Sequence, residues 1–380
     1  MKNSYGKTAI FGLVFSLFLF SACLQEVKDF FEEQQSPLQD WYAVSDKELL
    51  TDWLYDVCYG GGKFVAVGGK QPLIVWSADG VEWIRVFLNK LEGIPNDNNG
   101  NEFKKSGYFR TVCYNEQKNL YVAAGSHGYV FWSQDGKTWT KADSKLPVTE
   151  TVYSVDTGNG VFVCGASNGQ IIYSDNGKNW NLLDRAALYS VFSGRSINRV
   201  HFDGTRFFAT TSTGKIAAST RGTTVESWYT GGSSGFEGYE YAGVDGIWSN
   251  GTKVMAGSNN GFIAYYPAFF GAGEAAYSGF SMTPWSMVLD GSGNPNPPLG
   301  QSSRGAIFGI YDVTYAHGTW FVCGTDGKVA YSADNGVTWK QVKDSKRSGM
   351  RADAFAANSK ILLTVGRQGR ISYCRFEFPE

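Results

Sequence analysis

The stretch YSADNGVTW at residues 331–339 combines a serine, an aspartate, an Asn-Gly turn and a tryptophan. The same combination recurs as WSADGVEW (76–83), WSQDGKTW (132–139) and YSDNGKNW (173–180). Asn and Gly tolerate positive φ, so each copy predicts a tight turn between two strands. Asp or Ser can accept hydrogen bonds from the turn's own amides, and Trp can cover the hairpin. None of these roles needs a substrate, so the pattern indicates a structural joint.

Each of these turns ends a longer repeat. The repeat reads as strand, turn, strand, glycine-containing turn, strand, Asp-Gly or Asn-Gly turn, and a final strand that begins at Trp. Four copies are clear, two between them are degenerate, and the last has only three strands. The seven copies begin at Tyr55, Tyr108, Thr151, Ile197, Gly243, Ile310 and Ala352. Four-stranded repeats of about 40–50 residues predict a β-propeller.

The short last copy, 352–378, predicts how the propeller closes. It lacks an outer strand, and DWYAVS (40–45) is a strand-like segment that contains the required Trp. Pairing the two leaves no blade with an open edge. We therefore expect an all-β fold: a seven-bladed β-propeller of four-stranded antiparallel blades, closed by an N-terminal strand that completes the last blade.

The four turns resemble the Asp-box, or BNR repeat, Ser-x-Asp-x-Gly-x-x-Trp. One copy matches every defined position, two follow a form one residue shorter, and one has Asn in place of the acid. The matching residues are Ser332, Asp334, Gly336 and Trp339; Ser77, Asp79, Gly80 and Trp83; Ser133, Asp135, Gly136 and Trp139; and Ser174, Asn176, Gly177 and Trp180. In sialidase-like propellers and those of the photosystem II assembly-factor type, these boxes lie away from the ligand face. The resemblance thus implies a structural role and specifies fold more than activity.

The N-terminus resembles a bacterial lipoprotein signal. Lys2 and Lys7 precede an apolar stretch from Thr8 to Phe20, and FSAC (20–23) places small residues before Cys23. The resemblance implies that Cys23 becomes the lipidated first residue, although Phe20 stands where such signals usually carry Leu. Ordinary secretory cleavage is the alternative.

These features predict the domain organisation and the location of the protein. We expect a signal peptide at 1–22, an acidic tether at 23–40 and a single propeller domain at 41–380. A multiply acylated cysteine anchors a protein without a transmembrane helix. The predicted location is the bacterial cell envelope, lipid-anchored to a membrane and either periplasmic or surface-exposed.

The composition limits the partners. The net charge is −1 and only 18% of residues are charged, so no basic stripe is present to bind nucleic acid. No cysteines have metal-ligand spacing, and neither a metal nor a cofactor is predicted. Cys58 and Cys113 share one repeat position; they are either small buried residues or a disulfide.

Propeller geometry separates two faces. The turns that resemble Asp-boxes lie on one face, and the blade-to-blade connections lie on the other. Nearly all of the long insertions fall in the second class, at 84–109, 181–196, 229–243 and the end of the stretch 267–309. Loops on a rigid scaffold commonly carry function, which makes this the predicted binding face. The alternative is that long loops accumulate where insertion is cheap.

Charged residues are predicted at one end of the central channel. Counting back twelve residues from Gly68, Gly257 and Gly324 in the second strands reaches an aspartate each time. With the other blades, the predicted ring is Asp56, Thr111, Ser154, Arg199, Asp245, Asp312 and Asp353. It could bind a cation, an amine or sugar hydroxyls, and converging carboxylates should raise at least one pKa. Alternatively, each Asp bonds backbone amides of the neighbouring blade. Arg367, in a turn on the same face, suits a carboxylate ligand.

Two functions fit this pattern. The favoured one is a binding or scaffold module for an envelope or host protein or glycan, with aromatic residues between 239 and 285 as contacts or as core. The alternative is a glycoside hydrolase of sialidase-like type. Such enzymes usually carry Arg-Ile-Pro or Arg-Leu-Pro before the first box, and neither tripeptide occurs here. Other glycosidases use two carboxylates about 5–10 Å apart, which the ring could supply.

Overall fold

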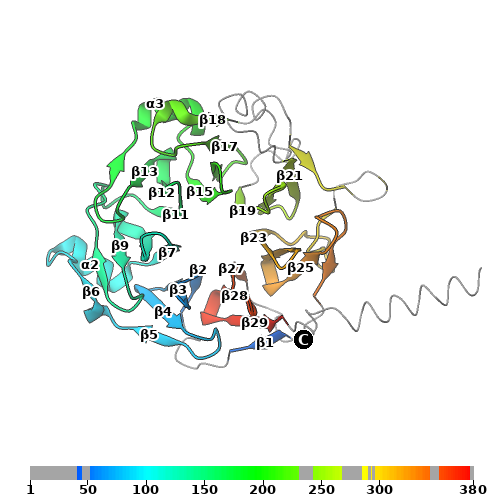
Figure 1. Cartoon of the computed structure of the whole chain (residues 1–380), viewed down its shortest axis with the longest axis horizontal. Helices are drawn as coiled ribbons and strands as arrows, with labels where there is room; N and C mark the ends of the chain where they lie inside the picture. Colours follow the sequence, from blue (N-terminus) through cyan, green and yellow to red (C-terminus); the bar gives the residue numbers. More distant parts are fainter. Residues whose placement is uncertain are drawn as a thin grey trace, which may run out of the picture.

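The computed structural model shows a ring of seven blades around a common axis (Figure 1). It describes residues 41–44, 52–230, 243–267, 285–289, 292, 296–342 and 351–376. The predicted signal peptide and tether lie outside the described residues. The inner strands β2, β7, β11, β15, β19, β23 and β27 surround the axis, and each blade runs outward from its inner strand.

Both α-helices of the described residues lie in blade-to-blade connections: one follows blade one and the other follows blade three. Blade one is β2 (Leu54–Gly60), β3 (Lys63–Gly68), β4 (Leu73–Ser77) and β5 (Ile84–Val86). Then come η1 (Leu88–Lys90), β6 (Leu91–Glu92) and α2 (Asn98–Ser106). Blade two is β7 (Phe109–Asn115), β8 (Leu120–Gly125), η2 (Ser126–Gly128), β9 (Val130–Ser133) and β10 (Trp139–Lys141), with β6 parallel to β10 at its edge. Blade three is β11 (Val152–Gly158), β12 (Val161–Ala166), η3 (Ser167–Gly169), β13 (Ile171–Ser174) and β14 (Asn181–Leu182), followed by α3 (Arg185–Phe192).

The remaining blades repeat the pattern. Blade four is β15 (Ile197–Phe202), β16 (Phe207–Thr211), β17 (Ile216–Ser219), η4 (Val225–Ser227) and β18 (Trp228–Thr230). Blade five is β19 (Val244–Ser249), β20 (Lys253–Ser258), β21 (Ile263–Pro267) and β22 (Ser286–Met287). Blade six is β23 (Ile310–Ala316), β24 (Thr319–Gly324), η5 (Thr325–Gly327), β25 (Val329–Ser332) and β26 (Lys340–Gln341). Blade seven is β27 (Ala352–Ala357), β28 (Ile361–Gly366), η7 (Arg367–Gly369), β29 (Ile371–Arg375) and β1 (Trp41–Ala43).

The N-terminal strand closes the ring. Strand β1 pairs antiparallel with β29, with Trp41 opposite Cys374 and Ala43 opposite Ser372. Figure 1 shows β1, in blue, beside β29, in red. The Trp41 side chain is buried, so it fills the outer end of the blade as a predicted final-strand Trp should. The predicted seven-bladed propeller and its closure are confirmed.

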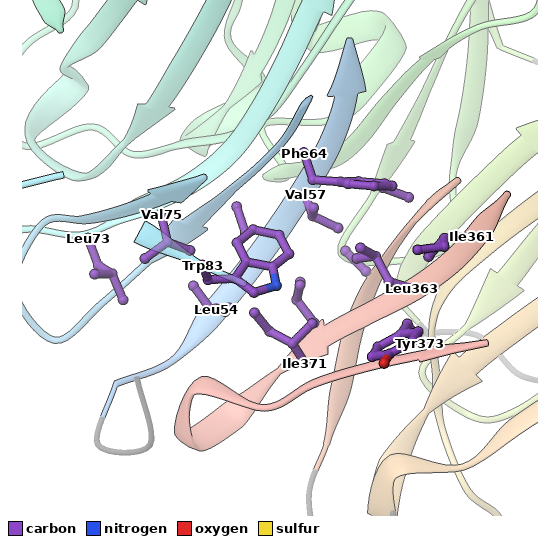
Figure 2. Close-up of a cluster of buried hydrophobic side chains, with 14 residues drawn as sticks. Leu54, Val57, Phe64, Leu73, Val75, Trp83, Ile361, Leu363, Ile371 and Tyr373 are labelled. Carbon is purple, nitrogen blue, oxygen red and sulfur yellow. The ribbon is translucent and has the colours of Figure 1, made fainter. Parts of the chain in front are cut away.

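Apolar side chains fill the space between neighbouring blades. Figure 2 shows the contact between blades one and seven, where Leu54, Phe64 and Trp83 meet Leu363 and Ile371. All five side chains are buried. Each Å² of apolar surface removed from water contributes about 25 cal/mol, so these clusters hold the blades together.

The four Ser-Asp-Gly-Trp turns form internal hydrogen-bond networks. In the turn of blade one, Ser77 Oγ accepts from Gly80 N at 2.8 Å, and Asp79 Oδ1 accepts from Glu82 N at 2.9 Å. Trp83 donates its indole N–H to the Gly80 carbonyl at 3.0 Å. Burial raises the pKa of Asp79, but these donated hydrogen bonds outweigh it and lower that pKa overall. The carboxylate is therefore held ionised by its own turn.

The turn with the fullest match to the repeat departs from this geometry. It contains one extra residue, Asn335, which adopts a φ of 59°. Asn335 Oδ1 accepts a hydrogen bond from the indole of Trp320 at 3.0 Å. The Trp339 indole N–H is buried and has no hydrogen-bond partner. The longer turn thus exchanges the usual indole-to-glycine bond for a contact with the second strand.

These turns also pack against the preceding blade. Gly177 has a φ of +71°, and a Cβ at this position would lie 2.7 Å from Leu120 Cδ2 of blade two. Gly80 faces Leu363 and Gly136 faces Val65 in the same way. Glycine is required here both by the backbone conformation and by the close approach of the preceding blade.

The opposite face carries the second-to-third-strand turns. In all seven blades the first amide after the second strand donates to the carbonyl that precedes the inner strand, at 2.6–3.1 Å. These pairs are Gly69–Trp53, Ser126–Tyr108, Ser167–Thr151, Ser212–Ser196, Asn259–Gly243, Thr325–Gly309 and Arg367–Arg351. Helix α2 packs on this face, since the Phe103 and His127 rings lie 5.7 Å apart.

Several features bear on the remaining expectations. Cys58 and Cys113 are both free thiols rather than a disulfide. Tyr266 and Trp285 are buried against one another in blade five, whereas most of the predicted aromatic group lies outside the described residues. No helix in the described ranges is long and apolar enough to cross a membrane.

Candidate functional site at the channel mouth

A β-bulge near the start of every inner strand places two layers of side chains at the channel mouth. Pairing with the second strand skips one residue in each of the seven blades. The skipped residues, here the bulge layer, are Tyr55, Arg110, Tyr153, Asn198, Asp245, Tyr311 and Asp353. The residues that follow them, here the inner layer, are Asp56, Thr111, Ser154, Arg199, Gly246, Asp312 and Ala354.

The predicted single ring is therefore wrong. Gly68 pairs with Leu54, whereas Gly257 pairs with Gly246. Counting back twelve residues from the glycine therefore reaches the inner layer in blade one but the bulge layer, at Asp245, in blade five. In blade seven Gly366 pairs with Ala352, as Gly68 pairs with Leu54, so twelve residues back lies Ala354 and the prediction of Asp353 was one residue out. Asp245 and Asp353 consequently belong to the bulge layer, while Asp56, Arg199 and Asp312 belong to the inner layer. Arg367 lies outside both layers, exposed on η7, with its guanidinium 4.9 Å from the Trp53 ring centroid.

Inner-layer side chains join neighbouring blades. A carboxylate or hydroxyl of one blade accepts a hydrogen bond from a backbone amide of the next blade at 2.8–3.0 Å. The pairs are Asp56 with Val112 N, Thr111 with Val155 N, Ser154 with Val200 N, and Asp312 with Phe355 N. For Asp56 and Asp312, the structure matches the alternative in which the aspartates bond backbone amides of the neighbouring blade.

Arg199 spans the inner layer. Its Nη2 lies 2.9 Å from Asp312 Oδ1, and its Nη1 lies 3.5 Å from Asp56 Oδ1. Burial lowers the pKa of Arg199, but the Asp312 and Asp56 carboxylates outweigh this and raise it. Burial raises the pKa of Asp312 to about 6, although Arg199 opposes the rise. The positive charge of Arg199 is thus paired with carboxylates of blades one and six, and it stabilises the contact between these blades and blade four.

The bulge layer encloses a polar cavity of about 100 Å³. This volume accommodates several water molecules or the tip of one side chain. The lining residues are Tyr55, Arg110, Tyr153, Asn198, Arg199, Asp245, Tyr311, Arg351 and Asp353. Arg110 stacks on Tyr55 at 4.6 Å and Arg351 stacks on Tyr311 at 3.5 Å, measured to the ring centroids.

Asp353 is an under-bonded carboxylate in this cavity. Its side chain is 3% exposed, and Oδ1 lies 2.6 Å from Arg351 Nε. The contact is an ion pair rather than an aligned hydrogen bond, because Arg351 Nε has no hydrogen-bond partner. Asp353 Oδ2 is buried and also has no hydrogen-bond partner. Burial raises the pKa of Asp353 to about 6, with Arg351 and Arg110 opposing the rise.

Asp245 lines the same cavity as Asp353. Its Oδ1 accepts a hydrogen bond from Asn198 Nδ2 at 2.7 Å. Burial raises the pKa of Asp245, although Arg351, Arg110 and the Asn198 hydrogen bond oppose the rise. Within the described ranges, no group of three His, Cys, Asp or Glu side chains could hold a metal ion. The site is suited to hydrogen bonding and ion pairing with an organic ligand.

Sequence reasoning missed most of the cavity wall. The bulge residues Tyr55, Arg110, Tyr153, Asn198 and Tyr311 each precede a predicted ring position by one residue. An aromatic or polar residue immediately before each predicted ring residue is the feature of the sequence that could have indicated them. Arg351 also lines the cavity, but it lies two residues before Asp353, immediately before strand β27 begins.

Comparison with known proteins places the chain among β-propellers. The family model for the DUF6242 beta propeller domain matches residues 95–236. No curated protein sequence matches the chain. Among solved structures it is similar to YCF48 bound to D1 peptide, with a TM-score of 0.63, 17% identity, and coverage of 90% of this chain and 96% of that one.

Two further structures support the same class. YCF48 from Cyanidioschyzon merolae aligns with a TM-score of 0.61 and 17% identity, covering 88% of this chain and 98% of that chain. The WD40 β-propeller domain of Doa1 aligns with a TM-score of 0.57 and 13% identity, covering 87% and 94% respectively. At these identities the likeness shows the fold alone.

Proposed function

We propose that this protein is a lipid-anchored cell-envelope β-propeller that binds a segment of a protein partner at the channel mouth. The observation that carries the proposal is the residue content of this face. The residues, here the mouth cluster, are Trp53, Tyr55, Tyr108, Arg110, Tyr153, Tyr311, Arg351 and Arg367. Trp, Tyr and Arg are the residue types that dominate binding energy at protein interfaces.

The mouth cluster is also ordered in advance of binding. Arg110, Arg351 and Arg367 each stack on an aromatic ring of the same cluster. None of the eight residues is fully buried, so their outer edges remain available. Side chains that are already held lose less conformational entropy when a partner binds. The similar fold of YCF48, seen bound to a D1 peptide, provides a precedent for a peptide partner on this architecture.

Cys23 supplies the membrane anchor in this proposal, and residues 24–40 hold the propeller away from the lipid surface. The four Ser-Asp-Gly-Trp turns keep a structural role on the opposite face. A glycan remains the competing ligand, because aromatic rings and carboxylates also bind sugars.

The proposal is tested by selecting peptides from a random display library on the immobilised protein. Enriched peptides should bind the native protein and lose affinity by about tenfold or more with Trp53→Ala, Tyr55→Ala or Arg110→Ala. Val337→Ala is the matched control, because Val337 is 65% exposed on a turn of the other face. Failure to enrich any peptide, or binding that survives all three substitutions, would contradict the proposal.

A parallel assay addresses the glycan and enzyme alternatives. The same protein is screened on a glycan array and against fluorogenic sialosides and aryl glycosides. We expect no turnover. Turnover that is abolished by Asp353→Asn would replace the binding-module proposal with a hydrolase.

A further inference from the structure

Three cations at the channel mouth lie over one connected series of aromatic rings. The Lys70 ammonium and the Arg367 guanidinium lie 5.7 Å and 4.9 Å from the centroid of the Trp53 ring. The Trp53 ring meets the Tyr55 ring edge-on at 6.0 Å, and the Arg110 guanidinium lies 4.6 Å from the Tyr55 centroid. A second tyrosine ring continues the series 5.9 Å beyond Tyr55. The six residues, here the cationic strip, are Lys70, Arg367, Trp53, Tyr55, Arg110 and Tyr108.

The cationic strip crosses three neighbouring blades. Arg367 belongs to η7 of blade seven, Trp53 and Lys70 lie beside strands β2 and β3 of blade one, and Arg110 lies in β7 of blade two. Figure 1 shows the inner strands of these blades, β27, β2 and β7, side by side around the axis. Lys70 and Arg367 are exposed, and the other members of the strip are half-buried. A partner at the channel mouth can therefore contact all three cations.

The carboxylates nearby are already bonded to other groups. The pairs are Asp52 with Arg85, Asp56 and Asp312 with Arg199, Asp353 with Arg351, and Asp245 with Asn198. By contrast, Lys70, Arg110 and Arg367 have no carboxylate within 4 Å in the part of the chain that the structure describes. The strip therefore keeps three positive charges without an ion-pair partner there, in a protein whose net charge is only −1.

The two guanidinium groups of the strip are also free to donate hydrogen bonds. Neither Arg110 nor Arg367 donates from its side chain to any residue of the described ranges. Arginine can stack on an aromatic ring through its planar face while its N–H groups point outward along its edges. A carboxylate binds that edge with two parallel hydrogen bonds. Positive charge, free donors and positions held by the rings together suit carboxylate ligands.

Polymers of phosphate suit the strip less well than a peptide. Nucleic acids and anionic lipid surfaces bind to longer runs of cations. Asp245 and Asp353 line the adjacent cavity and would repel closely spaced phosphates. An acidic peptide can place a few carboxylates over the three cations and keep the rest of its length away from the cavity.

We propose that the cationic strip binds an acidic segment of the protein partner, with aspartate or glutamate carboxylates on Arg110, Arg367 and Lys70. This inference rests on the proposed function, because it specifies the chemistry of the segment that binds at the channel mouth.

The test compares two short synthetic peptides that are blocked at both ends. One alternates glutamate with serine, and the other has glutamine in place of each glutamate, so that the two differ in charge alone. Binding to the native protein is followed by NMR titration at about pH 7.5, where glutamate is ionised. We expect saturable binding of the glutamate peptide, about tenfold or more tighter than that of the glutamine peptide. Its affinity should fall as salt is added, because salt screens exposed charges.

Substitutions in the strip assign this binding to its cations. Arg110→Gln, Arg367→Gln and Lys70→Gln should each weaken the glutamate peptide by about twofold to fivefold, and the triple variant by about tenfold or more. Lys137→Gln is the matched control, because Lys137 is exposed and lies 4.2 Å from the Trp76 ring on the opposite face. Arg110→Glu combined with Arg367→Glu should instead favour a peptide that alternates lysine with serine.

The thermal unfolding midpoint of each variant is measured alongside, so that a loss of fold is recognised. If Arg110→Gln unfolds, the exposed positions Lys70 and Arg367 and the salt dependence of the native protein decide the question. Three outcomes would overturn the inference: no saturable binding, equal binding of the glutamate and glutamine peptides, or glutamate-peptide binding unchanged in the triple variant. Tighter binding of a polyphosphate or a heparin fragment through the same residues would also overturn it, in favour of a polyanion.

The peptides selected from the display library separate this inference from the proposed function. Selected peptides that require the mouth cluster but keep their affinity when every acidic residue is replaced by its amide would refute the acidic segment and leave peptide binding intact. Glutamate-peptide binding that depends on Arg110 and Arg367, with no peptide enriched from the library, would refute selective peptide recognition and leave the carboxylate site intact.

Discussion

Arg199 Nη2 lies 2.9 Å from Asp312 Oδ1, although the two residues belong to blades four and six and are 113 positions apart in the sequence. The same guanidinium reaches Asp56 of blade one at 3.5 Å. One side chain thus links three blades across the axis, directly beneath the cavity. This bridge holds the inner-layer side chains that lie below the bulge layer, and Arg199 itself lines the cavity.

Removing the bridge should destabilise the propeller strongly. Arg199→Ala leaves the buried Asp312 and Asp56 carboxylates uncompensated, and breaking such a pair typically costs about 3–5 kcal/mol. The free energy of unfolding, measured in urea, should fall by that amount. Arg221→Ala, at an exposed arginine, is the control. Addition of Asp312→Asn to Arg199→Ala should recover part of the loss, and a loss below about 1 kcal/mol would contradict the bridge.

Asp353 should make stability depend on pH. Its folded-state pKa of about 6 lies above the ordinary value of 3.8, so folding favours the protonated carboxyl. That stabilising contribution is complete below 3.8 and is lost as the pH rises through 6. Asp353→Asn should therefore gain stability relative to the native protein as the pH rises through this range.

The rise in pKa sets an upper limit of about 3 kcal/mol on this gain, and loss of the Arg351 ion pair reduces it. Urea unfolding at a series of pH values between about 4 and 8 measures the difference. The interpretation fails if Asp353→Asn becomes progressively less stable than the native protein over that range.

Two glycines with similar backbone conformations separate strain from packing. Gly160 has a φ of +76° and open space around it, whereas Gly177 has a φ of +71° and faces Leu120 of blade two. Gly160→Ala should cost about 1–2 kcal/mol from the left-handed conformation alone. Gly177→Ala should cost about 1–3 kcal/mol more, because its methyl group enters the blade interface. Equal losses in thermal unfolding would show that the turn does not pack as described.

The proposed anchor predicts a change in location. Cys23→Ser should move the protein from the membrane fraction to the soluble fraction of bacteria that express it, because the lipid attachment site is lost. Mass spectrometry of the native N-terminus should detect an acylated cysteine. An unmodified protein in the soluble fraction would instead match ordinary secretory cleavage.

The fold was predictable because each blade repeats the same local physics. The Asn-Gly and Asp-Gly turns fix hairpins, and the missing outer strand after Arg375 matches the extra strand at Trp41. The outer strand of blade five, Ser286–Met287, was not predicted, since it follows a long insertion and lacks a matching turn.

The candidate site was only partly predictable. Strand alternation indicates which side chains face the axis, but a β-bulge shifts that register by one residue without any change in composition. Asp56 and Asp312 were placed correctly in one layer. Asp353 was assigned to the wrong layer although its hairpin has the same length as theirs, because the allowance made for turn length in blade seven was not needed. The stacking of Arg110 on Tyr55 depends on that bulge and could not be counted from the sequence.

Hydrogen–deuterium exchange with a selected peptide bound tests the central claim most directly. We predict protection at the starts of the inner strands and at the second-to-third-strand turns, including Tyr108–Arg110 and Arg351–Asp353, and none at the Ser-Asp-Gly-Trp turns. Protection centred on those turns, or absent from the channel mouth, would contradict it.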